Sequence, residues 1–250
     1  MNNFKFNKSL YWIIFLFFLF LFLFLFPFFF FLKKFGVYLS NKNKGSEPFT
    51  SSSNKNNNIV LIGDSILNNS VYVFKNESVP DLINNKMKPD QLFYNFAKDG
   101  ATIQDCINHL ANIPQDKINV LESETSIIVS AGGNDILNSR DTTNINIKAL
   151  FEKYIQLISA VKKTFHKNKN ENDNENIKII ALNLYYPFNP SYKTFYPFIK
   201  KWNELLDANQ EKHGYQLLKI DSIIVDPDDV IYDVEPSFKG GKKISEQILK

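Results

Sequence analysis

Short apolar runs alternate with amphipathic segments from residue 59 to residue 250. Five of these runs have the length and composition of β-strands, and they lie at 59–62, 92–96, 126–130, 177–184 and 216–220. The segments between them repeat apolar residues with the period of an α-helix. Strands that alternate with helices predict an α/β fold of three layers, with a five-stranded, parallel, doubly wound sheet in the middle.

Two of the expected helices carry a start signal. Ser78 precedes Pro80 and Asp81. Thr102 stands three positions before Asp105. Both combinations are typical of the first turn of a helix, where a side-chain oxygen accepts hydrogen bonds from free backbone N–H groups. Apolar residues recur at helical spacing within 103–111, 147–165 and 195–206. We therefore expect three helices that each bury one face.

A Phe-rich stretch without charge precedes this domain. It extends over residues 10–32, with lysines directly on either side, and is long enough to span the hydrocarbon of a bilayer. A cleaved signal peptide would have a shorter apolar region and a small-residue cleavage site instead of the lysines that follow here. The sequence thus divides into a flank (1–9), a transmembrane anchor (10–32), a polar linker (33–58) and a domain (59–250). We expect a single-pass membrane protein, and the lysines at both ends of the span leave the side of the domain open.

Composition excludes several functions. The formal net charge is +3, but residues 1–58 hold seven lysines and one acidic residue, so the domain itself is mildly acidic. An acidic domain in a chain with a single arginine, Arg140, lacks the basic face that nucleic acid requires. Cys106 is the only cysteine, which excludes an intramolecular disulfide and a zinc site built from thiolates.

Small and polar residues follow the first three predicted strands. These segments are Gly63-Asp64-Ser65, Asp99-Gly100-Ala101-Thr102 and Gly132-Gly133-Asn134-Asp135. The carboxyl ends of parallel strands lie at one edge of a sheet, where ligands bind. A serine hydroxyl, glycine N–H groups and an asparagine amide are the groups that acyl transfer needs, as nucleophile and as donors to the developing oxyanion. The set indicates ester hydrolysis, which requires neither a cofactor nor a metal.

In this order the motifs resemble those of the SGNH (GDSL-type) hydrolases. The resemblance covers residues 59–250, including Trp202-Asn203 before the last strand, and implies an SGNH fold of flavodoxin-like type. It also implies that Ser65 attacks the acyl carbon. The Ser65 and Gly100 backbone N–H groups and the Asn134 side chain would hold the oxyanion.

The end of the chain departs from the family pattern. The family has Asp, two residues, and then the catalytic His before a Pro, whereas this chain reads Tyr232-Asp233-Val234-Glu235-Pro236-Ser237. Glu235 stands in the position of the His and Tyr232 in that of the Asp. The Glu-Pro-Ser ending resembles a variant branch of the family. We take Glu235 and Asp233 as candidate catalytic residues beside Ser65, and expect slow turnover because a carboxylate is a weak base for a serine hydroxyl.

Other ionisable residues have simpler interpretations. The histidines at 109, 166 and 213 are expected at the surface. The acidic stretch 226–235 lacks the ligand spacing of a calcium loop and is expected to be a solvated loop.

Three functions remain open at this point. The leading one is a membrane-anchored serine hydrolase that cleaves a small acylated lipid or carbohydrate. The second is a catalytically inactive module that binds such a ligand in the same cleft. The third is a protein-interaction domain, which a cleft filled by side chains would favour.

Overall fold

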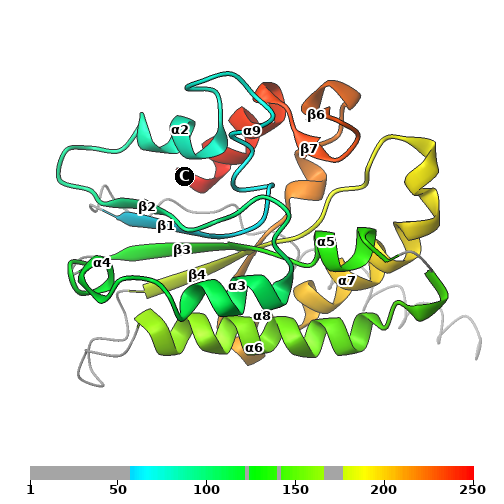
Figure 1. Ribbon diagram of the computed structural model, residues 1–250, viewed down its shortest axis with the longest axis horizontal. Coiled ribbons are helices and arrows are strands. Elements are labelled where there is room, and N and C mark those ends of the chain that lie inside the picture. The colour runs from blue at the N-terminus through cyan, green and yellow to red at the C-terminus, as the bar shows by residue number, and fades with distance from the viewer. Residues whose placement is uncertain (1–56, 122–123, 140–141, 166–176) are drawn as a thin grey trace, which may run out of the picture. The chain divides into compact units, whose positions relative to one another are not determined.

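A parallel sheet of five strands forms the middle layer of the domain (Figure 1). The computed structural model describes residues 57–121, 124–139, 142–165 and 177–250. The strands are β1 (Asn58–Gly63), β2 (Phe93–Asn95), β3 (Thr125–Ser130), β4 (Ile177–Leu182) and β5 (Gln216–Leu218), in the spatial order β2-β1-β3-β4-β5. All neighbouring pairs are parallel. The five predicted strands and the α/β class are thereby confirmed.

Helices cover both faces of the sheet (Figure 1). On one face α2 (Val79–Asn84) packs against α9 (Phe238–Ile248). On the other, α6 (Ile147–Phe165) packs against both α3 (Ile103–Leu110) and α7 (Tyr196–Ala208). Three short helices complete the set: α4 (Gln115–Asn119), α5 (Gly133–Leu137) and α8 (Gln210–His213). The predicted three layers follow from this arrangement, and both faces of the central strands are buried.

Both predicted helix starts are present. The Ser78 hydroxyl accepts a hydrogen bond from the Asp81 N–H and caps α2. Thr102 and Asp105 form a reciprocal capping box at the start of α3. These caps satisfy backbone donors that the first turn of a helix leaves free, and they involve residues three positions apart. Such local interactions are why the starts can be predicted.

Strand β4 ends two residues earlier than predicted, and the reason is a distant side chain. Asn203 on α7 accepts a hydrogen bond from the Leu184 N–H at 2.9 Å and donates one to the Leu184 carbonyl at 2.7 Å. Both polar backbone groups of Leu184 are therefore bonded outside the sheet. Strand β5 is also shorter, because Ile220 begins a 3₁₀ turn (Ile220–Ser222).

A second, small sheet brings the end of the chain towards β1. Strands β6 (Val230–Ile231) and β7 (Glu235–Pro236) pair antiparallel. Tyr232 and Asp233, between them, have φ values of +48° and +70°. This left-handed backbone reverses the chain within a short turn and leaves both side chains exposed.

The acidic stretch before this sheet is not simply solvated, contrary to our expectation. The Asp229 side chain is completely buried and lies 2.7 Å from the Lys243 ammonium on α9. It also accepts hydrogen bonds from the N–H groups of Val225 and Asp226. Burial would raise the pKa of Asp229, but these partners together hold it below its ordinary value. The residue anchors α9 to the loop that precedes β6.

The candidate membrane span (10–32) lies outside the residues that the structure describes, as do most of the linker, Arg140 and His166. Within the described ranges, no helix is both long and apolar enough to cross a membrane.

Candidate active site

The predicted nucleophile lies in the first turn after β1, at the carboxyl end of the sheet. Strand β1 ends at Gly63, whose φ is +151° and whose position admits no side chain, because a Cβ would come within 2.1 Å of the Ser130 carbonyl oxygen. The chain then turns, with the N–H groups of Leu67 and Asn68 bonded to the Asp64 carbonyl. This turn places Ser65 at the wall of a cavity.

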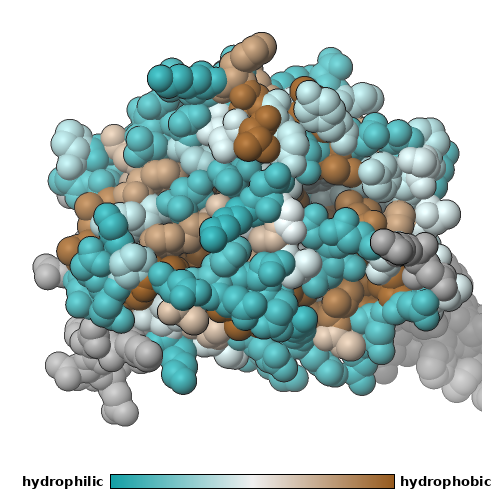
Figure 2. All heavy atoms as spheres, in the orientation of Figure 1, coloured by the Kyte–Doolittle hydropathy of each residue, from teal (hydrophilic) through white to brown (hydrophobic). Residues whose placement is uncertain are grey.

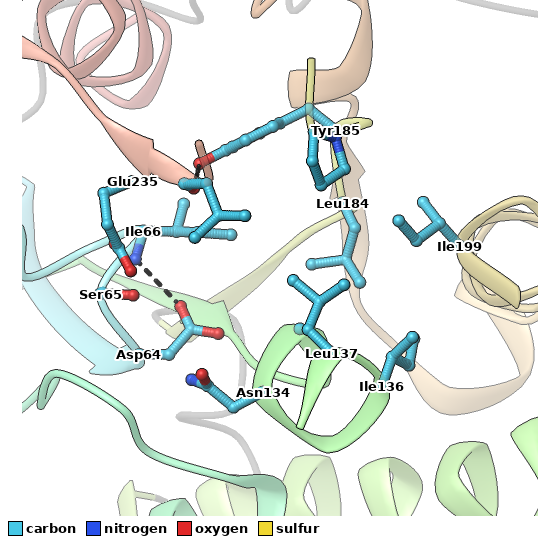
Figure 3. A pocket seen from close by; sticks show the side chains of 13 residues that line it. Asp64, Ser65, Ile66, Asn134, Ile136, Leu137, Leu184, Tyr185, Ile199 and Glu235 are labelled. Carbon is cyan, nitrogen blue, oxygen red and sulfur yellow. Dashed lines mark hydrogen bonds between the residues drawn. The ribbon is translucent and has the colours of Figure 1, made fainter. Parts of the chain in front are cut away.

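The cavity has a polar side and an apolar side (Figure 3). It encloses about 470 Å³, including the part open to solvent. Asp64, Ser65, Asn134 and Glu235 form the polar side. The apolar side is formed by Ile136, Leu137, Leu184, Tyr185 and Ile199. The cleft is therefore open rather than filled by side chains, which removes the observation that would have favoured a protein-interaction domain.

Glu235 lies beside the Ser65 hydroxyl. Strand β7 carries it over the turn after β1, and its carboxyl oxygens point towards Ser65 (Figure 3). Burial raises the pKa of Glu235 to about 7; the interaction with the Ser65 hydroxyl opposes this shift, and the charges of Asp64 and Asp99 add to it. The second carboxyl oxygen, Oε2, is buried and finds no hydrogen-bond partner among the described residues. A carboxyl group in this state can exchange a proton near neutral pH.

Asp64 is a second buried carboxyl at the site. Its Oδ1 accepts hydrogen bonds from the Ser130 hydroxyl at 2.8 Å and from the Ile66 N–H at 3.2 Å. Burial raises the pKa of Asp64 to about 6, although these hydrogen bonds lower it. The side chain thus ties the turn after β1 to the end of β3.

The three groups that were predicted to hold the oxyanion differ in how they lie. Within the described part of the chain, the backbone N–H groups of Ser65 and Gly100 make no hydrogen bond. Gly100 has φ of +69° and stands in the turn before α3. The Asn134 amide lines the cavity and spends one N–H on the Ala101 carbonyl, at 3.0 Å, which leaves the other for a ligand. Gly100 is not among the residues that line the cavity.

Glycine and aspartate fix the loop that carries Asn134. Gly132 has φ of +106°, and a Cβ there would lie 2.4 Å from the Trp202 ring. Asp135 accepts a hydrogen bond from the Ile103 N–H at 2.9 Å, which joins the start of α5 to the start of α3. The loops after β2 and β3 are therefore held together beside Ser65.

Asn69 joins the nucleophile turn to the strand of Glu235. Its side chain is fully buried, donates to the Pro236 carbonyl at 2.9 Å and accepts from the Val79 N–H at 2.8 Å. Pro236 directly follows Glu235 in β7. One asparagine thus connects the turn after β1, the start of α2 and β7.

Asp233, a candidate catalytic residue, and two of the histidines do not line the cavity. Asp233 is exposed in the turn between β6 and β7 and does not line the cavity. His109 and His213 are partly buried rather than free at the surface; burial lowers the pKa of each, and neither lines the cavity. The described residues contain no group of three or more His, Cys, Asp or Glu placed to hold a metal ion.

Some site residues could not be identified from the sequence. Asp64 stood in the Gly-Asp-Ser motif, but the motif gave it no role. No sequence motif pointed to Asn69 or Tyr185, because their hydrogen-bond partners lie far along the chain. The Tyr185 hydroxyl donates to the Val234 carbonyl and so supports the turn before β7.

Comparison with known proteins agrees with this fold. Three solved structures resemble the chain: a lipolytic G-D-S-L family protein of Veillonella parvula, a GDSL-like lipase of Bacteroides thetaiotaomicron and a lipase from a goat rumen metagenome. Their TM-scores are 0.58, 0.56 and 0.58, and their sequence identities are 18%, 15% and 22%. The alignments cover 77%, 86% and 78% of this chain and 96%, 94% and 96% of the respective structures. At these identities the likeness shows the fold.

No curated protein sequence matches the chain. The model of the GDSL-like Lipase/Acylhydrolase family matches residues 59–247, which includes both Ser65 and Glu235. The chain belongs to this family of GDSL-like lipases and acylhydrolases.

Proposed function

We propose that this protein hydrolyses carboxylic esters, with Ser65 as nucleophile and Glu235 as general base. The observation that carries the proposal is the position of the Glu235 carboxyl, which faces the Ser65 hydroxyl in a cavity with an apolar wall. Membership of the lipase and acylhydrolase family supports the same reaction class. The Glu-Pro-Ser ending then belongs to a variant branch in which a carboxylate replaces the imidazole.

The reaction proceeds in two steps. As the Ser65 Oγ attacks the carbonyl carbon, its proton passes to Glu235, and the protonated carboxyl then gives that proton to the departing alcohol. Water attacks the acyl-enzyme in the same way and releases the acid. A general base works best when its pKa is near the working pH, and the Glu235 pKa of about 7 meets that condition. We expect slow turnover, because a carboxylate is a weak base for a serine hydroxyl. The other candidate, Asp233, is exposed in the turn before β7.

Negative charge on the carbonyl oxygen requires donors. The Ser65 N–H, the Gly100 N–H and the free N–H of Asn134 are suited to this role because none of the three is used by the described part of the protein. The apolar wall opposite them suits the acyl chain. An acyl ester of a lipid or carbohydrate is the substrate class that we propose, presented to a domain that residues 10–32 hold at a membrane.

The test is hydrolysis of p-nitrophenyl acetate and of acetylated sugars by the full chain in detergent. Beside it stand the variants Ser65→Ala, Glu235→Gln and Glu235→His. Ser65→Ala should abolish turnover, and Glu235→Gln should lower kcat/KM about a hundredfold to ten-thousandfold, as loss of a general base does. Turnover that survives Ser65→Ala would exclude Ser65 as the nucleophile.

A ligand-binding module is the second candidate, and the residue in the position of the family's histidine favours it. One oxygen of Glu235 has no partner in the described structure. A fluorophosphonate probe distinguishes the two functions. An esterase reacts with it at Ser65, whereas a pure binding module shows no labelling that Ser65→Ala removes.

A further inference from the structure

The most exposed large apolar side chains in the described structure belong to the two loops that carry the proposed catalytic residues. Phe74 is 81% exposed and Val71 69%, both in the loop between Ser65 and α2. Tyr232, in the turn before Glu235, is 71% exposed. Water disfavours such apolar surface, and exposed apolar patches mark sites of interaction. We call these three residues, Val71, Phe74 and Tyr232, the apolar rim.

The two loops touch each other beside the cavity. The rings of Tyr72 and Tyr232 lie with their centroids 6.0 Å apart. The Tyr72 hydroxyl donates to Asp99 at 2.6 Å, and Tyr72 is close enough to Glu235 for that carboxylate to contribute to its raised pKa, after burial and Asp99. The loop of Val71 and Phe74 therefore meets the turn of Tyr232, close to the strand that carries Glu235.

The exposure of the apolar rim is built into the backbone. Tyr232 has φ of +48°, a conformation that a bulky residue seldom adopts, and it stands on the tight turn of the small sheet. Phe74 exchanges hydrogen bonds with Glu77, whose N–H donates to the Phe74 carbonyl at 3.1 Å and whose carboxylate accepts from the Phe74 N–H at 3.3 Å. Both loops thus have a defined shape that turns apolar side chains outwards.

Apolar atoms also protrude at the upper edge of the face in Figure 2, among hydrophilic neighbours, where Figure 1 draws the loop before α2. Charged residues of both signs adjoin the rim: Lys75 is basic, and Glu77, Asp99 and Asp233 are acidic. A surface of this kind suits the interfacial zone of a lipid bilayer, where apolar side chains enter below the headgroups. It does not suit a highly charged partner.

The chain between the candidate span and the domain is long enough for the apolar rim to reach the bilayer. The candidate span ends at residue 32, and the about 26 residues from there to residue 58 can reach roughly 90 Å at most. Strand β1 starts at the edge of the sheet opposite Ser65, and its six residues cover about 20 Å. The chain is therefore long enough for the site edge of the domain to meet the membrane that holds it.

We propose that the apolar rim inserts into the interface of the bilayer and places the cavity mouth against its lipids. The proposal rests on the proposed function, because the contact is useful to an enzyme that cleaves acyl esters. Such substrates in the bilayer would then reach Ser65 without crossing water. The contact itself requires no hydrolysis. It can be measured on a protein that carries Ser65→Ala.

The chain is suited to a single-site fluorescent label. Cys106 is its only cysteine, is buried in α3 and has a thiol pKa that burial raises, so it should not react with a thiol-directed dye. The protein without an introduced cysteine, treated with the same dye, is the control that Cys106 does not react. A cysteine introduced at an exposed position then carries the only dye.

The experiment uses the full chain with Ser65→Ala, reconstituted in phosphatidylcholine vesicles and recovered by flotation. The dye is placed at Lys75→Cys, at Lys75→Cys together with Val71→Ser and Phe74→Ser, or at Val120→Cys. Val120 is also an exposed apolar residue, 47% exposed, but follows α4 at the opposite edge of the sheet. A nitroxide lipid, labelled near the headgroup end of its acyl chains, quenches dye that enters the interface.

We expect quenching at position 75 to exceed that at position 120 about twofold or more, and to fall to the level of position 120 when Val71 and Phe74 are replaced. Equal quenching at positions 75 and 120 would overturn the proposal, as would protein that does not float with the vesicles. If the apolar rim binds a partner other than lipid, dye at position 75 would likewise not be quenched more than dye at position 120. Because the protein is already inactive, neither result depends on whether the enzyme cleaves esters.

Discussion

At the scale of single residues, the site contains two buried carboxyl groups, those of Asp64 and Glu235, beside the Ser65 hydroxyl. Two hydrogen bonds stabilise the charged form of Asp64, whereas Glu235 has the Ser65 hydroxyl and one oxygen without a partner in the described structure. Burial raises the pKa of both, to about 6 and about 7 respectively. The charge of Asp64 also raises the pKa of Glu235. The two carboxyl groups thus differ in their hydrogen-bond partners.

This difference predicts how activity depends on pH. Glu235 must be ionised to accept the Ser65 proton, so kcat/KM should rise with pH and level off above about 7. Glu235→Gln should lose this rise along with most of its activity. Initial rates with p-nitrophenyl acetate between about pH 5 and 8, corrected with Ser65→Ala, provide the measurement. A profile already level at pH 5 would show that the base is not a carboxyl with a raised pKa.

Gly132 and Gly133 allow a matched test of the loop after β3. In Gly132→Ala the new Cβ meets the Trp202 ring at 2.4 Å on a backbone with φ of +106°, so we expect a loss of about 2–4 kcal/mol of unfolding free energy. In Gly133→Ala the nearest atom is at 3.6 Å, and we expect a change below about 1 kcal/mol. Urea denaturation followed by circular dichroism measures both. Similar losses would mean that Trp202 can move away.

At the scale of elements, the site depends on contacts between segments that are far apart in the sequence. Asn69 connects the turn after β1 with α2 and β7, and Lys243 on α9 neutralises the buried Asp229 that precedes β6. The first contact sets where Glu235 lies relative to Ser65. The second holds the helix that follows Glu235. Strand β7 does not belong to the five-stranded sheet, so these two contacts help to hold it in place.

Asn69→Ala should therefore affect both stability and catalysis. The change leaves the Val79 N–H and the Pro236 carbonyl without their partner, which should cost about 2–4 kcal/mol of unfolding free energy. Where the protein is still folded, kcat should fall because β7 is no longer held against the nucleophile turn. Asn112→Ala, at an exposed position, is the control and should change stability by less than about 0.5 kcal/mol. Unchanged kcat in folded Asn69→Ala would refute the positioning role.

The elements themselves could mostly be predicted, and the exceptions have a common cause. Strands with continuous apolar runs and helices with caps are local patterns, so β1, β3, α2 and α3 lie where expected. The predicted end of β4 was wrong because the Asn203 side chain forms hydrogen bonds with the backbone of Leu184. The expectation of a solvated acidic loop was wrong for Asp229, because the partly exposed Lys243 ammonium stabilises this buried carboxylate. Each exception depends on a side chain that arrives from another segment.

At the scale of the whole molecule, the buried carboxyls make folding depend on pH. The pKa of Glu235 is about 7 in the folded chain against an ordinary 4.5, so the folded state binds its proton more tightly than the unfolded state. The stability from that protonated carboxyl is complete below about pH 4.5 and is lost as the pH rises through about 7. A buried, ionised Glu235 thus lowers the stability of the domain at neutral pH.

Glu235→Gln should remove this cost, because glutamine resembles the protonated acid but cannot ionise. Relative to wild type, the variant should gain on the order of 2 kcal/mol of unfolding free energy between about pH 4.5 and 7.5. Chemical denaturation across this range measures the difference. Glu246→Gln, at an exposed position on α9, should show no such gain. A constant difference between wild type and Glu235→Gln would contradict burial as the cause of the raised pKa.

The sequence by itself determined the order of strands and helices, the serine turn after the first strand and the family, because periodicity, caps and short motifs are local. Only the tertiary structure decided that Glu235 faces Ser65, that Asp233 lies outside the cavity and that Asn69 joins the two segments. Ser65 and Glu235 are separated by most of the domain, and their distance depends on how the sheet, α2 and α9 pack. Packing of this kind arises from many long-range contacts, and no short stretch of sequence contains them.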